Sequence, residues 1–339
     1  MTNLLWRPIP AETAGVEKAV FPSIASIKSL LLRAYRRVIY WVTNDERYYG
    51  DNERQGEKVD VFRLVPFILI HTGCIGVFFV GVSTFAIALA CTLYFARMFF
   101  ITAFYHRYFS HRTYEVPRFV QALMAILGCT AGQRGPLWWA SHHRSHHLHS
   151  DTVEDPHSPN QNGFWFSHTL WFLTPKAYSA SERHIKDWLR YPELKWIDRT
   201  DSLPFIGLGI ACYALGTLAQ QNSPQLGTSG LQLLVWGFFV STTCLYHATF
   251  TINSVAHLVG TRRFKTRDNS RNNPILALIT LGEGWHNNHH RYPCSAKQGF
   301  YWWEFDIAYF GIWLMSLFGL VKNIQRVPAS ILSSNRNVS

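Results

Sequence analysis

The sequence predicts an all-α membrane protein, with four transmembrane helices and a helical cap that holds a metal site on one face of the membrane. Three observations carry this prediction. Hydrophobic residues make up 48% of the 339 residues and charged residues only 16%, whereas about 25% is usual in soluble proteins. Mean hydropathy is nevertheless close to zero, so the apolar residues are concentrated in a few segments. Clustered histidines adjoin those segments.

The four predicted spans are 64–81, 84–104, 203–219 and 231–252. Each approaches the roughly 20 apolar residues that a helix needs to cross a bilayer. The first two are joined by a turn at Gly81-Val82-Ser83. A further apolar stretch, 117–135, is short for a span and is expected to be interfacial or buried.

These spans define three regions of the chain. Residues 1–63 form a basic N-terminal region, 64–325 the membrane domain, and 326–339 a polar C-terminal tail. Around Ile24–Tyr40 basic residues punctuate aliphatic and aromatic ones. That pattern fits a helix lying on the membrane surface and equally an amphipathic helix packed on the protein.

The charge and the cysteines of the sequence indicate the cellular environment of the protein. The net charge is +11, and no nucleic-acid motif accompanies it, which favours a membrane-proximal cytosolic face. The six cysteines have no Cys-x-x-Cys spacing and are expected to be buried apolar side chains rather than a disulfide framework. The N-terminus has no signal-peptide pattern.

Lysine and arginine also predict the orientation. The connector 220–230 and the turn near Gly81 contain neither residue, whereas every histidine-bearing segment is flanked by them. The positive-inside rule therefore places both termini and all histidine clusters on the cytosolic side. We expect the bacterial inner membrane, with the endoplasmic reticulum as the alternative.

The most informative pattern is a repeated His-x-x-His-His motif. It occurs as His143, His146 and His147 and again as His286, His289 and His290. On a helix this spacing places all three imidazoles on one face. One such motif could arise by chance or as a structural zinc site. Two copies indicate a larger metal centre.

Two further groups follow predicted spans. His106 and His111 are five residues apart, which on a regular helix separates the rings by about 140°. We therefore expect His111 to lie just past the helix end. Asn253 and His257 are four apart and share a helix face. Imidazole alone does not name the metal, but eight or nine histidines exceed the four ligands of one zinc site and suit two metals.

The clusters resemble the histidine boxes of the membrane fatty acid desaturases, most nearly the acyl-CoA Δ9-desaturase (stearoyl-CoA desaturase) branch with its bacterial members. The matching stretches, within about 64–325, are His106-Arg107-Tyr108-Phe109-Ser110-His111, His143-Arg144-Ser145-His146-His147, Asp155-Pro156-His157-Ser158, Gly163-Phe164-Trp165-Phe166-Ser167-His168, Asn253-Ser254-Val255-Ala256-His257 and Gly282-Glu283-Gly284-Trp285-His286-Asn287-Asn288-His289-His290.

The resemblance implies two irons under a cytosolic cap. Its ligand positions correspond to His106, His111, His143, His146, His147, His257, His286, His289 and His290, with Asn253 holding a metal-bound water. His142 stands where this branch often has Asp, so we expect it to act behind the ligands at most.

The resemblance also implies the reaction. It is the insertion of a cis double bond, expected at Δ9, into a saturated acyl chain, with O2 as co-substrate. The carrier can be CoA, acyl carrier protein or phospholipid. A kinked apolar tunnel would position the chain. Tyr94 and Met98 are expected to set its depth, although ordinary packing explains these two almost as well, and Gln133, Trp139 and Thr249 are expected to form its walls.

Electrons must come from elsewhere, because the sequence contains no His-Pro-Gly-Gly motif of a fused cytochrome b5. Ferredoxin, cytochrome b5 or a flavin reductase are the expected donors, and a basic surface suits an acidic carrier.

Two alternatives remain. One is a related histidine-box hydroxylase or ketolase. The other is a non-catalytic membrane metal-binding protein, which would need polar residues along its spans. The spans contain little beyond His71, Arg97 and His247.

Overall fold

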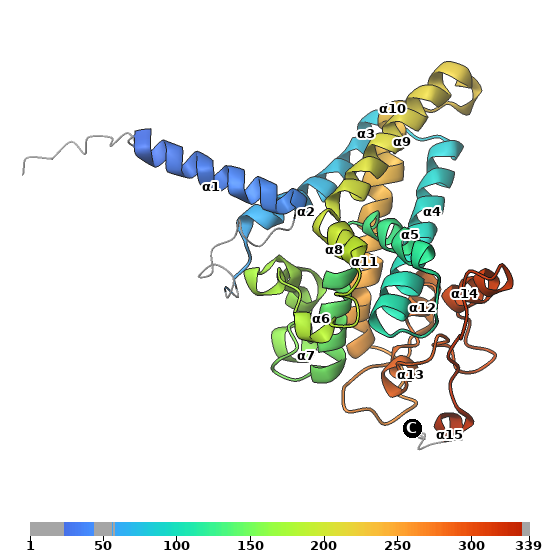
Figure 1. The fold of residues 1–339 in the computed structure, drawn as a ribbon. Helices are drawn as coiled ribbons and strands as arrows, with labels where there is room; N and C mark the ends of the chain where they lie inside the picture. Colours follow the sequence, from blue (N-terminus) through green and yellow to red (C-terminus); the bar gives the residue numbers. More distant parts are fainter. Residues whose placement is uncertain (1–23, 44–55, 57, 334–339) are drawn as a thin grey trace, which may run out of the picture.

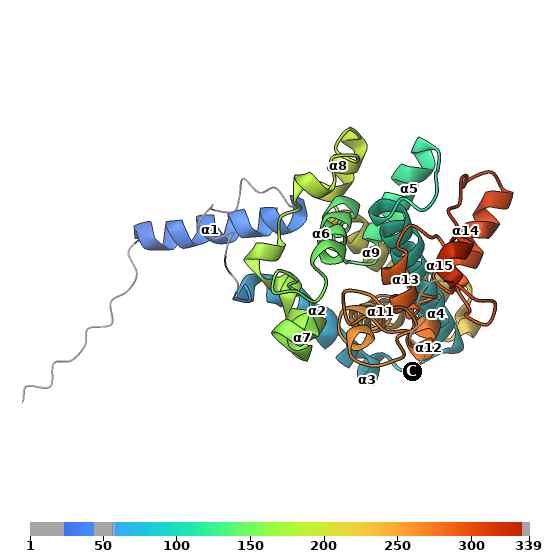
Figure 2. The ribbon, with the colours of Figure 1, turned by 90° about the horizontal axis from the view of Figure 1, so that it is seen from below.

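The computed structural model describes residues 24–43, 56 and 58–333, and within these ranges the chain is helical and has no β-strand. Long helices stand side by side over a broader cap of short helices and loops (Figure 1). Seen from below, the cap elements surround the ends of the long helices (Figure 2). The predicted all-α fold is confirmed.

Four helical segments are long and apolar enough to cross a membrane: Val61–Val80, Thr84–Ser110, Ser202–Asn222 and Gly230–His257. They overlap the four predicted spans. The first, which starts at Val61 rather than at residue 64, comprises α2 (Val61–Gly73), η3 (Cys74–Gly76) and α3 (Val77–Val80), and the third is α9 (Ser202–Asn222). These segments indicate that the protein is associated with a membrane.

The second and fourth spans run beyond their apolar parts into the cap. The second comprises α4 (Thr84–Phe99) and η4 (Phe100–Ser110). The fourth comprises α10 (Gly230–Leu233), η10 (Leu234–Val240), α11 (Ser241–Asn253) and η11 (Val255–His257). Both therefore carry histidines on extensions of these long helices.

The first two spans have defined starts. The Asp60 side chain accepts a hydrogen bond from Phe62 N (2.8 Å) at the start of α2. The Ser83 hydroxyl accepts one from Ala86 N (3.1 Å) at the start of α4. Between the two helices Gly81 has φ +67°, a conformation that glycine adopts without strain. The predicted turn is therefore present.

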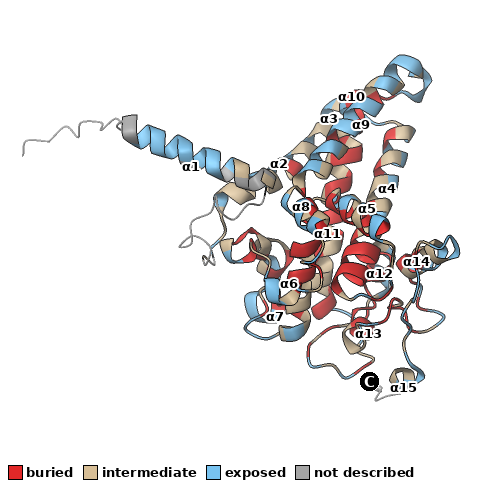
Figure 3. Ribbon diagram, viewed as in Figure 1, coloured by how far each residue is buried: buried red, intermediate tan, exposed pale blue. Residues whose placement is uncertain are grey.

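Burial divides the long helices into an outer and an inner part. Their ends away from the cap are largely exposed, whereas the parts that meet the cap are buried (Figure 3). In the apolar window of the first span only 6% of residues are buried, against 56% in the fourth. The fourth span is therefore the central helix, and the exposed apolar surfaces of the others match what lipid would cover.

The polar residues inside the spans face protein. Arg97 is buried and donates to Ser241 Oγ (2.5 Å) and Thr242 Oγ1 (2.8 Å) on the fourth span. His71 Nε2 lies 3.1 Å from His247 Nε2, so it bridges the first and fourth spans. Both residues satisfy buried polar groups between helices.

The cap is built from short helices: α5 (Arg118–Cys129), α6 (Pro136–His149), α7 (Pro159–Asn162), α8 (Pro192–Arg199), α12 (Pro274–Ile279), α13 (His286–Arg291) and α14 (Ile307–Leu317). α5 is the short apolar helix expected within 117–135. The predicted N-terminal amphipathic stretch forms α1 (Ile24–Thr43), which projects from the body (Figure 1). α15 (Ala329–Ser333) lies in the predicted tail. Residues 1–23, 44–55, 57 and 334–339 of the two predicted terminal regions lie outside the described residues.

Candidate metal centre

The first histidine pair is brought together by a π-helix. In η4 each N–H bonds the carbonyl five residues back, and His111 N donates to His106 O (3.2 Å). A spacing of five therefore closes one turn, and the two ring centroids lie 4.9 Å apart. His111 follows the helix end, as expected. The separation of about 140° that a regular α-helix would give does not arise, because the helix is a π-helix here.

The second cluster lies on α6. Its start is capped by Asp198, whose Oδ1 accepts from Leu137 N (2.8 Å) and Trp138 N (3.0 Å). Pro136 occupies the first turn, where it is tolerated because that turn has no intrahelical donor to lose. The cap therefore fixes the register of the helix that carries His143, His146 and His147.

Nine histidines converge in two groups. The first histidine group contains His106, His111, His143, His147 and His289, and the second contains His146, His257, His286 and His290. Within each group the candidate ligand atoms all lie within 4.8 Å of one another. The groups adjoin, since the rings of His147 and His290 stack at 4.5 Å. These are the nine histidines singled out in the sequence.

The ring nitrogens of the first histidine group lie close enough together to bind one cation. Nε2 of His289 lies 3.0 Å from Nε2 of His106 and 2.9 Å from that of His147. Burial, with the charge of neighbouring histidines, holds the pKa of His147 and His289 well below the usual value. Neutral rings turn lone pairs toward one another, an arrangement that a shared metal ion stabilises.

The second group also brings two Nε2 atoms close together. His257 Nε2 lies 3.0 Å from His286 Nε2. Burial, with the charge of neighbouring histidines, lowers the pKa of His286. His290 Nε2 is buried and makes no hydrogen bond to the described residues. Buried polar atoms normally have a hydrogen-bond partner, so a buried ring nitrogen without one, beside three other imidazoles, has the environment of a metal ligand. The residues therefore fit a transition metal.

Four carboxylates contact the Nδ1 atoms of these rings. Glu283 contacts His106, Asp155 contacts His146 (2.9 Å), Asp151 contacts His257 (2.9 Å) and Asp268 contacts His290 (2.8 Å). A carboxylate that accepts from Nδ1–H fixes the tautomer and leaves Nε2 as the ligand atom. It also makes the imidazole a stronger electron-pair donor to a metal through Nε2.

Asp151 shows how firmly such an acid is held. Its Oδ2 also accepts from Asn269 N (2.7 Å), and its Oδ1 accepts from Ser158 Oγ (2.6 Å). Burial alone would raise the pKa of Asp151, but the hydrogen bond and charge of His257 outweigh it and lower that pKa. The carboxylate is therefore ionised when it supports His257.

The four carboxylates are divided unequally. Three of them support the second histidine group, and only Glu283 supports the first. Sequence reasoning missed all four. Asp155 and Glu283 lie inside matching stretches, which was the available signal. No sequence signal pointed to Asp151 or Asp268, because only the fold brings these two carboxylates to their histidine partners.

The remaining histidines of the described chain lie outside the two groups. The His142 ring packs against Trp138 at a tilt (4.4 Å between centroids), and burial lowers the pKa of His142 to about 4. His157 stacks on His146 and contacts Asp155. His149 pairs with Glu154 at the surface. His142 therefore contacts the aromatic wall of a cavity rather than a ligand.

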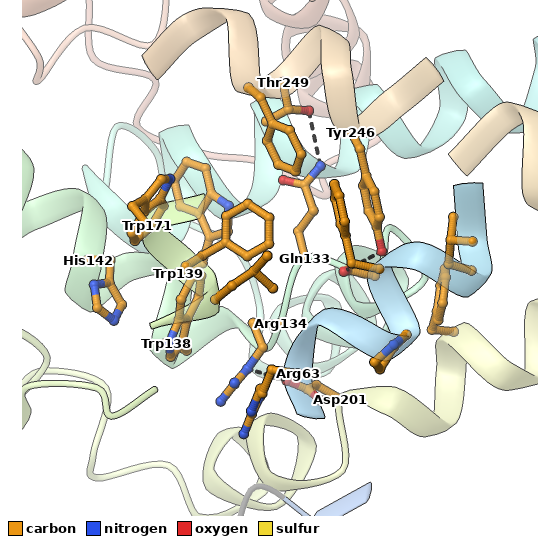
Figure 4. Close-up of a pocket in the computed structure, with 18 of the residues that line it drawn as sticks. Arg63, Gln133, Arg134, Trp138, Trp139, His142, Trp171, Asp201, Tyr246 and Thr249 are labelled. Carbon is orange, nitrogen blue, oxygen red and sulfur yellow. Dashed lines mark hydrogen bonds and ion pairs between the residues drawn. The ribbon is translucent and has the colours of Figure 1, made fainter. Parts of the chain in front are cut away.

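Two cavities meet beside the histidine groups. The outer cavity, of about 390 Å³, has aromatic and aliphatic walls and several polar groups (Figure 4). The inner cavity, of about 50 Å³, is lined by Met98, Ile101 and Thr102 among others. Both are lined by Trp139, His143, Thr249 and Asn253. The shared residues show that the two cavities adjoin beside the histidines.

Comparison with known proteins identifies the family. The family model described as fatty acid desaturase matches residues 83–318, well over half of the chain. This chain belongs to the fatty acid desaturase family. It is therefore an oxidoreductase that acts on fatty acyl chains.

Relatives of this desaturase bear specific names. An sn-2 palmitoyl-lipid 9-desaturase of Nostoc is 37% identical over 66% of this chain and 75% of its own. An sn-1 stearoyl-lipid 9-desaturase of Anabaena variabilis is 34% identical over 76% and 91%. An acyl-CoA 5-desaturase of Anemone leveillei is 34% identical over 82% and 83%.

The residues singled out as the tunnel of this desaturase fall in different places. Gln133 and Thr249 line the outer cavity and are joined by a hydrogen bond of 3.1 Å (Figure 4). Trp139 lines both cavities, and Met98 lines the inner one. Tyr94 lines neither, and its hydroxyl donates to the carbonyl of Ile279 (2.7 Å).

Proposed function

We propose that this desaturase inserts a cis double bond, at Δ9, into a saturated acyl chain, using two irons, O2 and two external electrons. The observation that carries the proposal is a pair of adjoining cavities beside two groups of imidazoles. A path for an apolar chain and two adjoining metal sites are the two parts that such a reaction needs.

The ligands we propose are the five imidazoles of the first histidine group for one iron and the four of the second for the other. Asn253, which lines both cavities, would hold a water on the second. Bound iron supplies the activation of O2, which protein side chains cannot provide. Imidazole ligands suit iron among several metals.

The chain's own residues position the substrate. An unactivated methylene offers no acidic proton, so selectivity rests on holding it in place. Trp139 and Thr249 lie where the two cavities meet, and the Gln133 amide bonds the Thr249 hydroxyl there. We propose that the acyl chain bends at this junction and ends in the inner cavity, near Met98.

Support for Δ9 comes from the two relatives named 9-desaturases. The relative named a 5-desaturase shows that position varies in the family at similar identity. We place the histidine groups and both termini on the cytosolic side of a membrane, the bacterial inner membrane being favoured. There, a soluble acidic donor such as ferredoxin, cytochrome b5 or a flavin reductase would reach the site.

Expression in a host that lacks the activity tests this function. Mass spectrometry should find new Δ9 double bonds only when O2 is present. The purified protein should hold about two irons per chain. His147→Gln should abolish product, because it removes a ligand of the first group. His149→Gln, two residues further along α6 and therefore on the opposite side of the helix, where His149 is paired with Glu154, should keep it.

Hydroxylated products without new unsaturation would show a different histidine-box oxidase. Zinc alone, with no oxygen-dependent product, would contradict the enzyme assignment.

A further inference from the structure

Two short helices beside the second span are apolar on every side. Neither α12 nor α14 contains a charged residue. One side of each is buried, as Ala277 and Ile312 show. The exposed large side chains are apolar as well, and we call them the α12–α14 face: Ile275, Leu278, Ile307, Phe310, Trp313, Leu314 and Leu317. A helix that is apolar all round lies inside a protein or inside a membrane, and the described chain leaves this face uncovered.

Both helices touch the second span within its membrane-crossing part. The Tyr94 hydroxyl donates to the carbonyl of Ile279 at the end of α12 (2.7 Å). The Phe99 ring packs so closely on Gly311 of α14 that a Cβ at this position would clash with it. A bilayer core takes in about 20 helical residues, which, counted from Thr84, extend to about residue 103. The two helices therefore meet the span at a depth that lipid tails reach.

The α12–α14 face continues the exposed side of that span. Phe95, whose ring contacts Tyr94 (5.1 Å between centroids), is itself exposed. The two short helices are also joined to each other, since Ala308 N donates to the Leu281 carbonyl just after α12 (2.9 Å). Figures 1 and 2 both show α12 and α14 beside the second span. An apolar surface therefore extends from the span onto the two helices.

The residues on either side of α14 match the edge of a membrane. Trp302 and Trp303, just before it, are exposed, and tryptophan is enriched where a membrane meets water. Lys322, shortly after it, is exposed and begins a polar stretch. The chain therefore enters and leaves α14 at the level where lipid tails give way to headgroups and water.

We propose that α12 and α14 lie in the leaflet next to the cap, with the α12–α14 face against lipid acyl chains. A second copy of this chain is the other occupant that such a face suits. Lipid is favoured, because the face shares its depth and its surface with the exposed side of the second span, which lipid covers. One side of the cap is then a pair of interfacial helices rather than a water-facing surface.

This placement anchors one histidine-bearing segment at both ends. α13, which carries three of the candidate ligands, lies between α12 and α14 in the sequence. At the start of α14, Asp306 accepts a hydrogen bond from Tyr309 N (2.9 Å) and pairs with Arg107 (2.8 Å). Arg107 also pairs with Glu283 (3.1 Å), the carboxylate that contacts His106. A helix held in lipid therefore supports the first histidine group through buried side chains.

Photocrosslinking of the full chain in liposomes of tritiated phosphatidylcholine tests the proposal. One variant carries benzoylphenylalanine in place of Phe310 and a second carries it in place of Leu317. A third, with the probe at Phe78 of the first span, is the lipid-facing reference. The fourth has it at Val153 in the cap loop between α6 and α7, which is 85% exposed against 83% for Phe78.

Irradiation joins the benzophenone to C–H bonds that touch it. We expect the variants at Phe310 and Leu317 to take up tritium within about twofold of the Phe78 reference, and the Val153 variant at least about tenfold less, because interfacial helices bury their apolar face among acyl chains. Each variant should melt within about 2 °C of the wild type in detergent, since it replaces an exposed side chain.

A charged substitution gives a second measurement. Phe310→Glu should lower the melting temperature in lipid nanodiscs, because its carboxylate would face acyl chains. Val153→Glu, in the cap loop, should leave the melting temperature unchanged. The two variants differ only in which exposed apolar side chain becomes acidic, so the comparison isolates the surroundings of that side chain.

Three results would overturn the proposal. Tritium uptake at Phe310 and Leu317 no higher than at Val153 would place the α12–α14 face in water. A crosslinked dimer without labelled lipid would assign the face to a second copy of the chain. An unchanged melting temperature of Phe310→Glu in nanodiscs would show that no lipid covers that position. None of these measurements involves the desaturase reaction, so the proposed function stands or falls separately.

Discussion

The carboxylates behind the imidazoles decide which nitrogen of each ring is free. Asp155 and Glu283 lie close in sequence to a histidine motif, so local pattern could have found them. Asp151 supports His257, 106 positions away. Such a partner is invisible to spacing arguments, because only the folded chain creates the contact. The histidines were predictable from sequence because helical spacing is a local property.

Loss of one such carboxylate should weaken metal binding without removing a ligand. Asp268→Asn replaces the acceptor of His290 Nδ1–H by an amide that is a poorer acceptor. We expect iron affinity at the second histidine group to fall by about 10- to 100-fold, and iron content to fall toward one per chain after dialysis. Glu193→Gln, which disrupts the surface pair with Arg118, is the matched control. Equal iron retention in both variants would refute a role for Asp268.

The length of the accepted acyl chain should depend on Met98. Its side chain is buried and lines the inner cavity. Met98→Phe should fill part of that space and shift the products toward shorter chains by about two to four carbons, since each added ring carbon displaces about one methylene. Tyr94→Phe should leave the chain-length profile unchanged, because Tyr94 lines neither cavity. Gas chromatography of the products measures both, and an unaltered Met98→Phe profile would exclude this end of the path.

At the scale of single helices, caps and turns determine where the histidines point. The π-helical turn at His106 and the Asp198 cap of α6 both act before any metal binds. The cap was not predicted, since Asp198 is about 60 residues from the N–H groups it accepts from. The π-helix was not predicted either, because hydrophobic patterning does not distinguish it from an α-helix over a single turn.

Asp198 should also make stability depend on pH. Burial, with the charge of Asp201 adding, raises the pKa of Asp198 to about 6. A carboxyl whose pKa is raised on folding stabilises the fold most below its unfolded pKa of about 4 and loses that contribution as pH rises through about 6. Asp198→Asn keeps an acceptor and stays neutral, so its melting temperature should fall less than the wild type's between pH 4 and 7.

Asp198→Ala provides the contrast, because it removes the acceptor. Its melting temperature should lie below that of both other proteins at neutral pH, by an amount that reflects about 1 kcal/mol for a lost cap. Thermal unfolding in detergent measures all three. Parallel pH curves for the wild type and Asp198→Asn would rule out the raised pKa.

The whole molecule places its four long helices and its histidine-bearing cap at opposite ends. Sequence predicted the long helices, because their apolar composition is decisive over 20 residues. It could not predict how the loops of the cap fold around the site. These loops are held by contacts between distant residues, such as the bond from Phe264 N to Asn287 Oδ1 (2.7 Å).

Orientation in the membrane can be measured directly. Contrary to the expectation that the cysteines are buried, Cys294 is exposed in the loop after α13. Ser223 lies in the connector at the other end. In cells that produce a variant with Cys294 as the only cysteine, an impermeant maleimide should label nothing until the membrane is opened. A variant with only Ser223→Cys should be labelled in intact cells. The reverse pattern would invert the proposed orientation.

The π-helix also constrains how this sequence can change in length. Its hydrogen bond from His111 to His106 spans one complete turn, so a residue gained or lost between them rotates one ring away by about 100°. The connector between α9 and α10, by contrast, touches no histidine and can grow or shrink without moving one. Insertions and deletions in this protein's lineage should therefore accumulate at the far end of the long helices and be excluded between His106 and His111.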